Sequence, residues 1–186
     1  MDTLPDHLGG HLNITNTDST ILPYLKQSIG IKTMIDIGCG PGGMKNIAES
    51  LDIEWTGVDG DFTLPNKDEI IIHDFSKGPL VINKTFDLAW STEFLEHVEE
   101  EYIENYMPVF QKASIAVVTA AAPGTPGYHH VNCKDLSYWS NVFARYGFEY
   151  DSGATMYLKQ ISNMRKNFFN RHGFCFKKDK EYHNEV

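Results

Sequence analysis

The chain has 186 residues, close to the common size of one folded domain, and we expect a single domain over residues 1–186. Its 25 Asp and Glu residues against 16 Lys and Arg give a formal net charge of −9. A surface of this sign repels phosphates at long range, which disfavours a general binder of nucleic acids or anionic membranes. We therefore expect a small molecule or a protein, rather than a nucleic acid or a membrane, as the substrate.

The cysteines and the apolar runs indicate in which cellular compartment the protein is expected. The three cysteines, Cys39, Cys133 and Cys175, are odd in number and far apart, which matches neither a disulfide framework nor a zinc knuckle. The start of the sequence lacks a basic segment that leads into an apolar one, and no run approaches the roughly 18 apolar residues of a membrane helix. We expect a cytoplasmic protein that does not contact a membrane.

The predicted elements alternate between helices and strands. After a polar lead, Asp18 can cap a helix that Gly30 ends. Further helices are expected over about 43–51, 97–108, 135–146 and 155–168, and Pro108 should end or kink the second of these. Strands are expected at 33–37, 53–58, 69–73, 86–90, 114–120, 148–151 and 173–178. This order indicates an α/β fold with a mainly parallel sheet covered on both faces.

A glycine-rich run follows the first predicted strand, with the sequence Asp-Ile-Gly-Cys-Gly-Pro-Gly-Gly over residues 36–43. Glycines allow a sharp turn and let a ligand approach the main chain without Cβ interference, while the next helix presents free N–H groups. The cofactor-contacting residues predicted here are Asp36, Gly38, Cys39, Gly40 and Gly42. Glycines at 38, 40 and 43 also fit the dinucleotide-binding spacing or an ordinary tight turn. The glycines alone therefore do not identify the ligand, and the flanking carboxylates must distinguish between the alternatives.

Those carboxylates favour a sulfonium cofactor over a dinucleotide. Asp36 would lie next to a cationic amino-acid group, whereas it would repel a pyrophosphate. Asp59, followed by Gly60, ends the second strand and can accept hydrogen bonds from ribose hydroxyls of either ligand. Asp74 and Phe75 could bind adenine, although Asp-Phe-Ser is also common turn chemistry. Ser91, at the end of the fourth strand, completes the predicted cofactor site.

Taken in this order, residues 36–43, 58–59, 73–75 and 86–88 resemble the successive motifs of class I S-adenosylmethionine-dependent methyltransferases. The resemblance covers about residues 31–120. A narrower resemblance is to small methyltransferases encoded by phages and bacteria, and it rests on residues 10–13, Asp18, 93–97, 129–132 and 138–139. If the protein is encoded by a phage, we expect it in the cytoplasm of the host.

The resemblance implies a Rossmann-like fold with a sheet of the seven-strand type, an antiparallel last strand and S-adenosylmethionine as the cofactor. It also divides the expected domain into three parts. Residues 1–30 would form an N-terminal cap or lid and a helix, 31–120 the cofactor-binding core, and 121–186 the acceptor-side loop with the C-terminal strands and helix.

Candidate acceptor-side residues follow the fourth and fifth strands, at the edge where such sheets bind ligands. Methyl transfer is an in-line displacement that positioning can accelerate, so a base is needed only when the acceptor must lose a proton. We expect acceptor contact or catalysis from Glu96, His97, His129 and His130, with Glu93 and Asn132 nearby; Glu96 and His97 could equally be polar residues at a helix start.

A metal site is not expected. Adjacent histidines seldom ligate one ion, and no carboxylate or cysteine stands at the usual ligand spacing in the sequence.

The two ends of the chain carry further candidates. His11, Asn13, Thr15 and Asp18 could fold over the cofactor as a lid, or serve only as caps and linker. The tail has an excess of basic residues. Such residues most often form a solvated face. They leave open a nucleotide-linked sugar or the end of a nucleic acid as the acceptor, although a small molecule is expected first. These basic residues are Lys159, Arg165, Lys166, Arg171, Lys177, Lys178 and Lys180.

Two rival functions remain open. A nicotinamide-dependent oxidoreductase would share the glycines and Asp59, but Asp36 counts against it and no Tyr-x-x-x-Lys pair follows the fifth strand. A non-catalytic S-adenosylmethionine-binding protein is the second rival, because the fold needs no fixed catalytic residue. The motifs imply neither an acceptor atom nor an oligomeric state.

Overall fold

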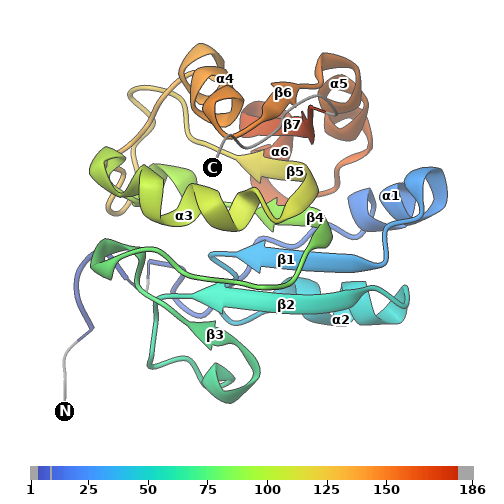
Figure 1. Ribbon diagram of the computed structural model, residues 1–186. Helices are drawn as coiled ribbons and strands as arrows, with labels where there is room; N and C mark the ends of the chain where they lie inside the picture. The colour runs from blue at the N-terminus through green and yellow to red at the C-terminus, as the bar shows by residue number, and fades with distance from the viewer. Residues whose placement is uncertain (1–3, 9, 180–186) are drawn as a thin grey trace.

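The computed structural model describes residues 4–8 and 10–179 and has one seven-stranded sheet of order β3-β2-β1-β4-β5-β7-β6 (Figure 1). The first five strands are parallel, and β7 lies antiparallel between β5 and β6. This confirms the expected mainly parallel, Rossmann-like sheet with an antiparallel last strand. The strands are β1 (Thr33–Ile37), β2 (Glu54–Asp59), β3 (Ile71–Ile72), β4 (Phe86–Ser91), β5 (Ala113–Thr119), β6 (Phe148–Tyr150) and β7 (Gly173–Lys178).

Helices cover both faces of this sheet. The α-helices are α1 (Ile21–Ile29), α2 (Gly43–Ser50), α3 (Ile103–Phe110), α4 (Leu136–Arg145), α5 (Ser152–Ile161) and α6 (Phe168–His172). Helices α3 and α4 contribute to one buried cluster, and α1, α2, α5 and α6 contribute to the other. Successive strand residues alternate between the two clusters: Met34 joins one and Ile35 the other, as do Leu88 and Ala89. Because strand side chains alternate between faces, strands buried on both sides read as continuous apolar runs.

Local signals explain where the first helix begins and ends. Asp18 accepts a hydrogen bond from the backbone N–H of Ile21 at 2.9 Å, and Gly30 follows the helix with a φ of 71°. The left-handed conformation at Gly30 suits a residue without Cβ. Both expected signals are confirmed.

Two predicted helices are corrected. The helix expected over 97–108 begins at Ile103, after short 3₁₀ turns at Leu95–His97 and Glu100–Tyr102, and continues through Pro108 to Phe110. Proline removes only one backbone donor there, and the helix ends two residues later with its Met107 and Phe110 side chains buried.

The helix expected over 155–168 is in fact two helices, α5 and α6. The chain leaves the helical path after Ile161, where the Asp18 carboxylate accepts hydrogen bonds from the backbone N–H groups of Asn163 and Met164. A contact between residues far apart in the sequence therefore overrides the local helical preference.

The topology brings four strand ends to one edge of the sheet. Strand β1 pairs in parallel with β2 and β4, and β4 with β5, so that their carboxyl ends lie side by side. The backbone N–H groups of Gly38 and Cys39 both donate to the Val58 carbonyl, which fixes the turn after β1 against β2. Within residues 4–8 and 10–179, no helix is long and apolar enough to cross a membrane.

Candidate functional site

A cavity of about 370 Å³ opens at this edge, between the loops that follow β1, β2, β4 and β5. Its volume lies in the range of small-molecule sites. One wall holds eight of the predicted cofactor residues: Asp36, Gly38, Cys39, Gly40, Asp59, Gly60, Asp74 and Phe75. The loops after β4 and β5 contribute three of the four predicted catalytic residues to the lining: His97, His129 and His130.

Two predicted cofactor residues lie outside the wall. Gly42 has a φ of 76° immediately before α2 and faces Trp55 and Asn66 rather than the cavity. Ser91 is buried and donates its hydroxyl to the Ile37 carbonyl at 2.8 Å, which ties β4 to β1. The structure gives both residues a role in shaping the turns.

The glycine-rich loop is held by Asp59. One carboxylate oxygen of Asp59 accepts the backbone N–H of Gly40 at 2.6 Å, and the other accepts that of Asp61 at 2.9 Å. A Cβ at Gly38, which has a φ of 74°, would lie 2.6 Å from the Phe94 ring, so this position requires glycine for conformation and for space.

Asp36 is buried at the base of the loop. Burial raises the pKa of its carboxyl to about 7, the charge of Asp59 adds to the rise, and a hydrogen bond from Trp55 Nε1 at 3.2 Å opposes it. Burial also raises the pKa of Asp59. A cation bound between these two carboxyls would relieve the cost of their ionisation.

The N-terminal segment covers part of the cavity. His11 lies in its wall and contacts Asp61 at 3.1 Å, while His7 Nε2 contacts Asp74 at 3.1 Å. Among the other residues proposed for a lid, Thr15 lines the cavity. Asn13 does not line it, and Asp18 is buried as an anchor for the tail.

The loops after β4 and β5 carry a group of histidines. His129 Nε2 contacts Glu99 Oε1 at 3.1 Å, and the rings of His97 and His130 meet edge to face at 4.9 Å between centroids. Burial lowers the pKa of His97 to about 4, helped by the neighbouring His130. Glu96 lies behind the wall, fully buried, and burial together with the charge of Glu93 raises its pKa to about 8.

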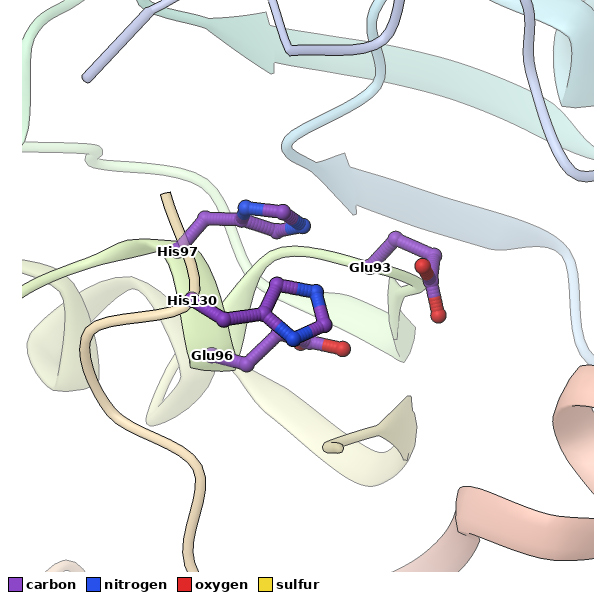
Figure 2. A group of neighbouring side chains, drawn as sticks. All are labelled: Glu93, Glu96, His97 and His130. Atoms are coloured by element: carbon purple, nitrogen blue, oxygen red, sulfur yellow. The ribbon is translucent and has the colours of Figure 1, made fainter. Parts of the chain in front are cut away.

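Four of these side chains converge. Glu93, Glu96, His97 and His130 each offer one ligand atom, and these atoms all lie within 4.8 Å of one another (Figure 2). No carboxylate stands at the usual ligand spacing in the sequence, but the fold brings two carboxylates close to two histidines. The signal was present in the sequence, because residues that follow neighbouring parallel strands meet at the same edge. Sequence spacing within one loop does not reveal such a group.

Part of the basic tail also reaches the cavity, which the sequence did not indicate. Arg165, Lys166 and His172 line it, and Lys166 has a φ of 55°. Four others, Lys159, Arg171, Lys177 and Lys178, lie outside the lining, and Lys180 falls outside the described residues. Asn132, a further candidate, is fully buried and does not line the cavity.

Comparisons with known proteins give structural matches only. No family model matches the sequence, and no curated protein matches it. A TehB-like SAM-dependent methyltransferase from Corynebacterium glutamicum superposes with a TM-score of 0.58 at 18% identity, covering 80% of each chain. The methyltransferase domain of bacterial CtHen1-C gives 0.59 at 16% identity, over 86% of this chain and 95% of that one. The fold is that of class I methyltransferases.

A third solved structure of the class I methyltransferase fold was determined with a cofactor product. The plantazolicin methyltransferase BpumL, in complex with a pentazolic analogue and SAH, gives a TM-score of 0.58 at 16% identity, over 87% of this chain and 83% of that one. At such identities the likeness extends to the fold alone. The narrower likeness to phage and bacterial enzymes stays a prediction.

Proposed function

We propose that this protein is an S-adenosylmethionine-dependent methyltransferase. One observation carries the proposal: a single cavity at the carboxyl ends of the strands has a glycine loop with strand-end carboxylates on one wall and a group of histidines on the other. The first wall suits a nucleoside with a cationic amino-acid end, and the second suits an acceptor. Proteins of the same fold include one crystallised with SAH.

The cofactor would lie along the β1–β2 side of the cavity. The Asp36 carboxylate would face its cationic amino-acid end, beside the backbone of Gly38 and Gly40. The Asp59 oxygens, which each accept one backbone N–H, keep further lone pairs for the ribose hydroxyls. Asp74 and Phe75 would face the adenine, with His7 covering them. S-adenosylmethionine would supply an electrophilic methyl group.

The acceptor would lie against the histidines. His129, held by Glu99, can take a proton from an acceptor, whereas the lowered pKa of His97 keeps its imidazole neutral at ordinary pH. Glu96 would act from behind the wall. This arrangement supports a role for all four residues near the acceptor, including His130.

The acceptor we propose is a small molecule with an anionic group. Arg165 and Lys166 line the cavity in a protein of net charge −9, so positive side chains are placed here against the overall trend. A nucleotide-linked sugar or the end of a nucleic acid would also present phosphate to these side chains. Free cysteines in the described chain fit a cytoplasmic setting.

Binding calorimetry separates this proposal from its rivals. The protein should bind S-adenosylhomocysteine and should show no heat of binding with NADH, because Asp36 would repel a pyrophosphate. Binding of NADH alone would favour the oxidoreductase. A protein that binds S-adenosylhomocysteine but never forms it from S-adenosylmethionine with any anionic acceptor would be the non-catalytic binder.

A further inference from the structure

The strongest unassigned feature is the group Glu93, Glu96, His97 and His130, which we call the acidic-histidine cluster. The first three residues follow β4 and the fourth follows β5, and the parallel pairing of Ser91 with Val118 brings the two loops together. The loop after β5 is also fastened directly to the cluster, because the backbone N–H groups of Val131 and Asn132 both donate to the Glu96 carbonyl at 3.0 Å.

The ligand atoms are spaced for one ion. All four lie within 4.8 Å of one another, and Figure 2 shows the side chains converging from the two loops. Two ligands on opposite sides of an ion with bonds of about 2.1 Å stand about 4.2 Å apart. Small side-chain rotations would therefore bring these atoms into a common coordination sphere.

A buried atom without a partner gives independent evidence. Glu96 is fully buried, and its Oε1 accepts the backbone N–H of Ala121 at 3.1 Å, but Oε2 has no donor among the described residues. No lysine or arginine of the described chain forms an ion pair with Glu93 or Glu96. A fully buried carboxylate oxygen without a donor is costly in a protein interior, and a bound cation would remove that cost.

The histidine tautomer also fits an ion. His130 Nδ1 lies 2.9 Å from the Thr125 carbonyl, which can only accept, so Nδ1 carries the proton and Nε2 keeps its lone pair. Histidines that bind metals usually donate their other ring N–H to a carbonyl or carboxylate in this way. Gly127 leaves room for this ring, since a Cβ there would lie 2.1 Å from His130 Nε2.

The backbone at Glu93 is strained toward the same arrangement. Glu93 has a φ of 56°, and its N–H donates to Thr119 Oγ1 at 2.9 Å. A non-glycine residue in the left-handed region is strained, and such residues concentrate at functional sites. The Glu93 carboxylate here lies within 4.8 Å of the ligand atoms of both imidazoles.

We propose that the acidic-histidine cluster binds one divalent first-row transition ion, of the Mn²⁺, Co²⁺ or Zn²⁺ type, at the acceptor-side wall. Two carboxylates balance the charge of a divalent ion. Imidazole nitrogens favour transition ions over Mg²⁺, which prefers oxygen ligands and retains water, and the group has no thiolate. His97, His130 and Glu93 line the cavity, so the open coordination positions face the acceptor.

The role of the ion in catalysis rests on the proposed function. A hydroxyl oxygen of the acceptor would bind the ion, which lowers the pKa of such a group, and would lose its proton to His129. A C–O bond would then form as the C–S bond breaks, with the electron pair of the C–S bond passing to sulfur. The cluster therefore predicts an alcohol as the acceptor.

Metal binding is tested without an acceptor. Protein stripped with a chelator and dialysed is titrated in a calorimeter with MnCl₂, CoCl₂ and MgCl₂, and Co²⁺ binding is also followed by its visible absorption. We expect one Mn²⁺ or Co²⁺ per chain and much weaker Mg²⁺ binding. Glu96→Gln and His130→Ala should each weaken Mn²⁺ binding by at least about 100-fold, since loss of merely supporting residues already costs 10–100-fold.

His129→Ala is the matched comparison, because His129 neighbours the cluster in sequence but pairs with Glu99 outside it; its Mn²⁺ affinity should equal that of the wild type. Circular dichroism shows whether each variant is folded. Absence of both Mn²⁺ and Co²⁺ binding by the wild type would overturn the metal site, as would unchanged affinity in both cluster variants. S-adenosylhomocysteine binding measured on the same samples tests the proposed function separately.

Discussion

Asp59 is the residue whose removal tests the cofactor wall most simply. Asp59→Ala should weaken S-adenosylhomocysteine binding by about 1.5–3 kcal/mol, the typical contribution of a hydrogen bond to a charged group. Calorimetry measures the change. Asp87→Ala is the matched control, because Asp87 also accepts two backbone N–H groups, from Lys32 and Thr33, but at the opposite end of the sheet. Asp87→Ala should keep wild-type affinity, and equal losses in the two variants would contradict the ribose assignment.

Asp36 should make cofactor binding depend on pH. Burial raises its pKa to about 7, and the ammonium group of the ligand favours the ionised carboxylate. The affinity for S-adenosylhomocysteine should therefore rise with pH up to about 7, by at most about tenfold per unit, and level off above it. Calorimetry between pH 6 and 8 measures this, and Asp36→Asn should bind weakly without the slope. The idea fails if the variant shows the wild-type slope.

The same carboxyl affects stability in the opposite direction. Its pKa in the folded protein lies above its ordinary value of 3.8, so the folded state holds a proton that the unfolded chain has lost. The contribution of Asp36 to the free energy of unfolding therefore falls as pH rises from about 4 to 7.

Residue types and strand ends allowed much of the lining of this cavity to be predicted. Asp36, Asp59 and Asp74 line the cavity because each lies at or near the carboxyl end of a parallel strand. Ser91 met the same criterion but turned inward to bond the Ile37 carbonyl. Alternation along a strand decides such cases, and a shift of one residue reverses the face.

At the scale of elements, the loop after β5 carries the acceptor prediction. Replacing both His129 and His130 with Ala should leave S-adenosylhomocysteine affinity nearly intact while lowering methyl transfer by about 10²–10⁴-fold, the usual contribution of a catalytic base. Formation of S-adenosylhomocysteine with an accepted substrate measures the transfer. Normal turnover by the folded variant would make both histidines ordinary polar loop residues. Lost cofactor affinity would move them to the cofactor wall.

Asp18 joins two elements that are far apart in the sequence. Its Oδ1 accepts the N–H of Ile21 at 2.9 Å, and its Oδ2 accepts the Ser162 hydroxyl at 2.5 Å and the backbone N–H groups of Asn163 and Met164. Asp18→Ala should lower the free energy of unfolding by about 3 kcal/mol, because several buried donors lose their acceptor. Urea denaturation measures it.

Asp135→Ala provides the comparison for a simple cap. Asp135 is exposed and accepts the Tyr138 N–H before α4, so its removal should cost only about 1 kcal/mol. Equal losses for the two variants would show that Asp18 is no more than a helix cap.

Helix boundaries were predicted well where a local signal sets them. Gly30 marks the end of α1, and Asp135 marks the start of α4, as expected. The break between α5 and α6 could not be predicted, because it depends on Asp18, more than a hundred residues earlier in the chain. Pro108 is expected to end or kink its helix, but the helix continues to Phe110, where burial of the surrounding apolar face offsets the missing hydrogen bond.

For the whole molecule, the alternation of strands and helices was enough to predict a doubly covered, mainly parallel sheet. The right-handed crossover rule leaves few arrangements for such an order. The acidic-histidine cluster could not be found by spacing along the sequence, since His130 lies 33 residues beyond His97 and reaches it only through the β4–β5 pairing. The proximity of these four side chains therefore depends on tertiary structure.

A crystal structure with S-adenosylhomocysteine tests the central claim most directly. We predict that the ligand occupies the cavity at the carboxyl ends of β1, β2 and β4, with its ribose hydroxyls on Asp59 and its amino-acid end near Asp36. Its sulfur should face the wall that carries His97 and His130. S-adenosylhomocysteine bound outside this cavity, or with its sulfur turned away from that wall, would contradict the account.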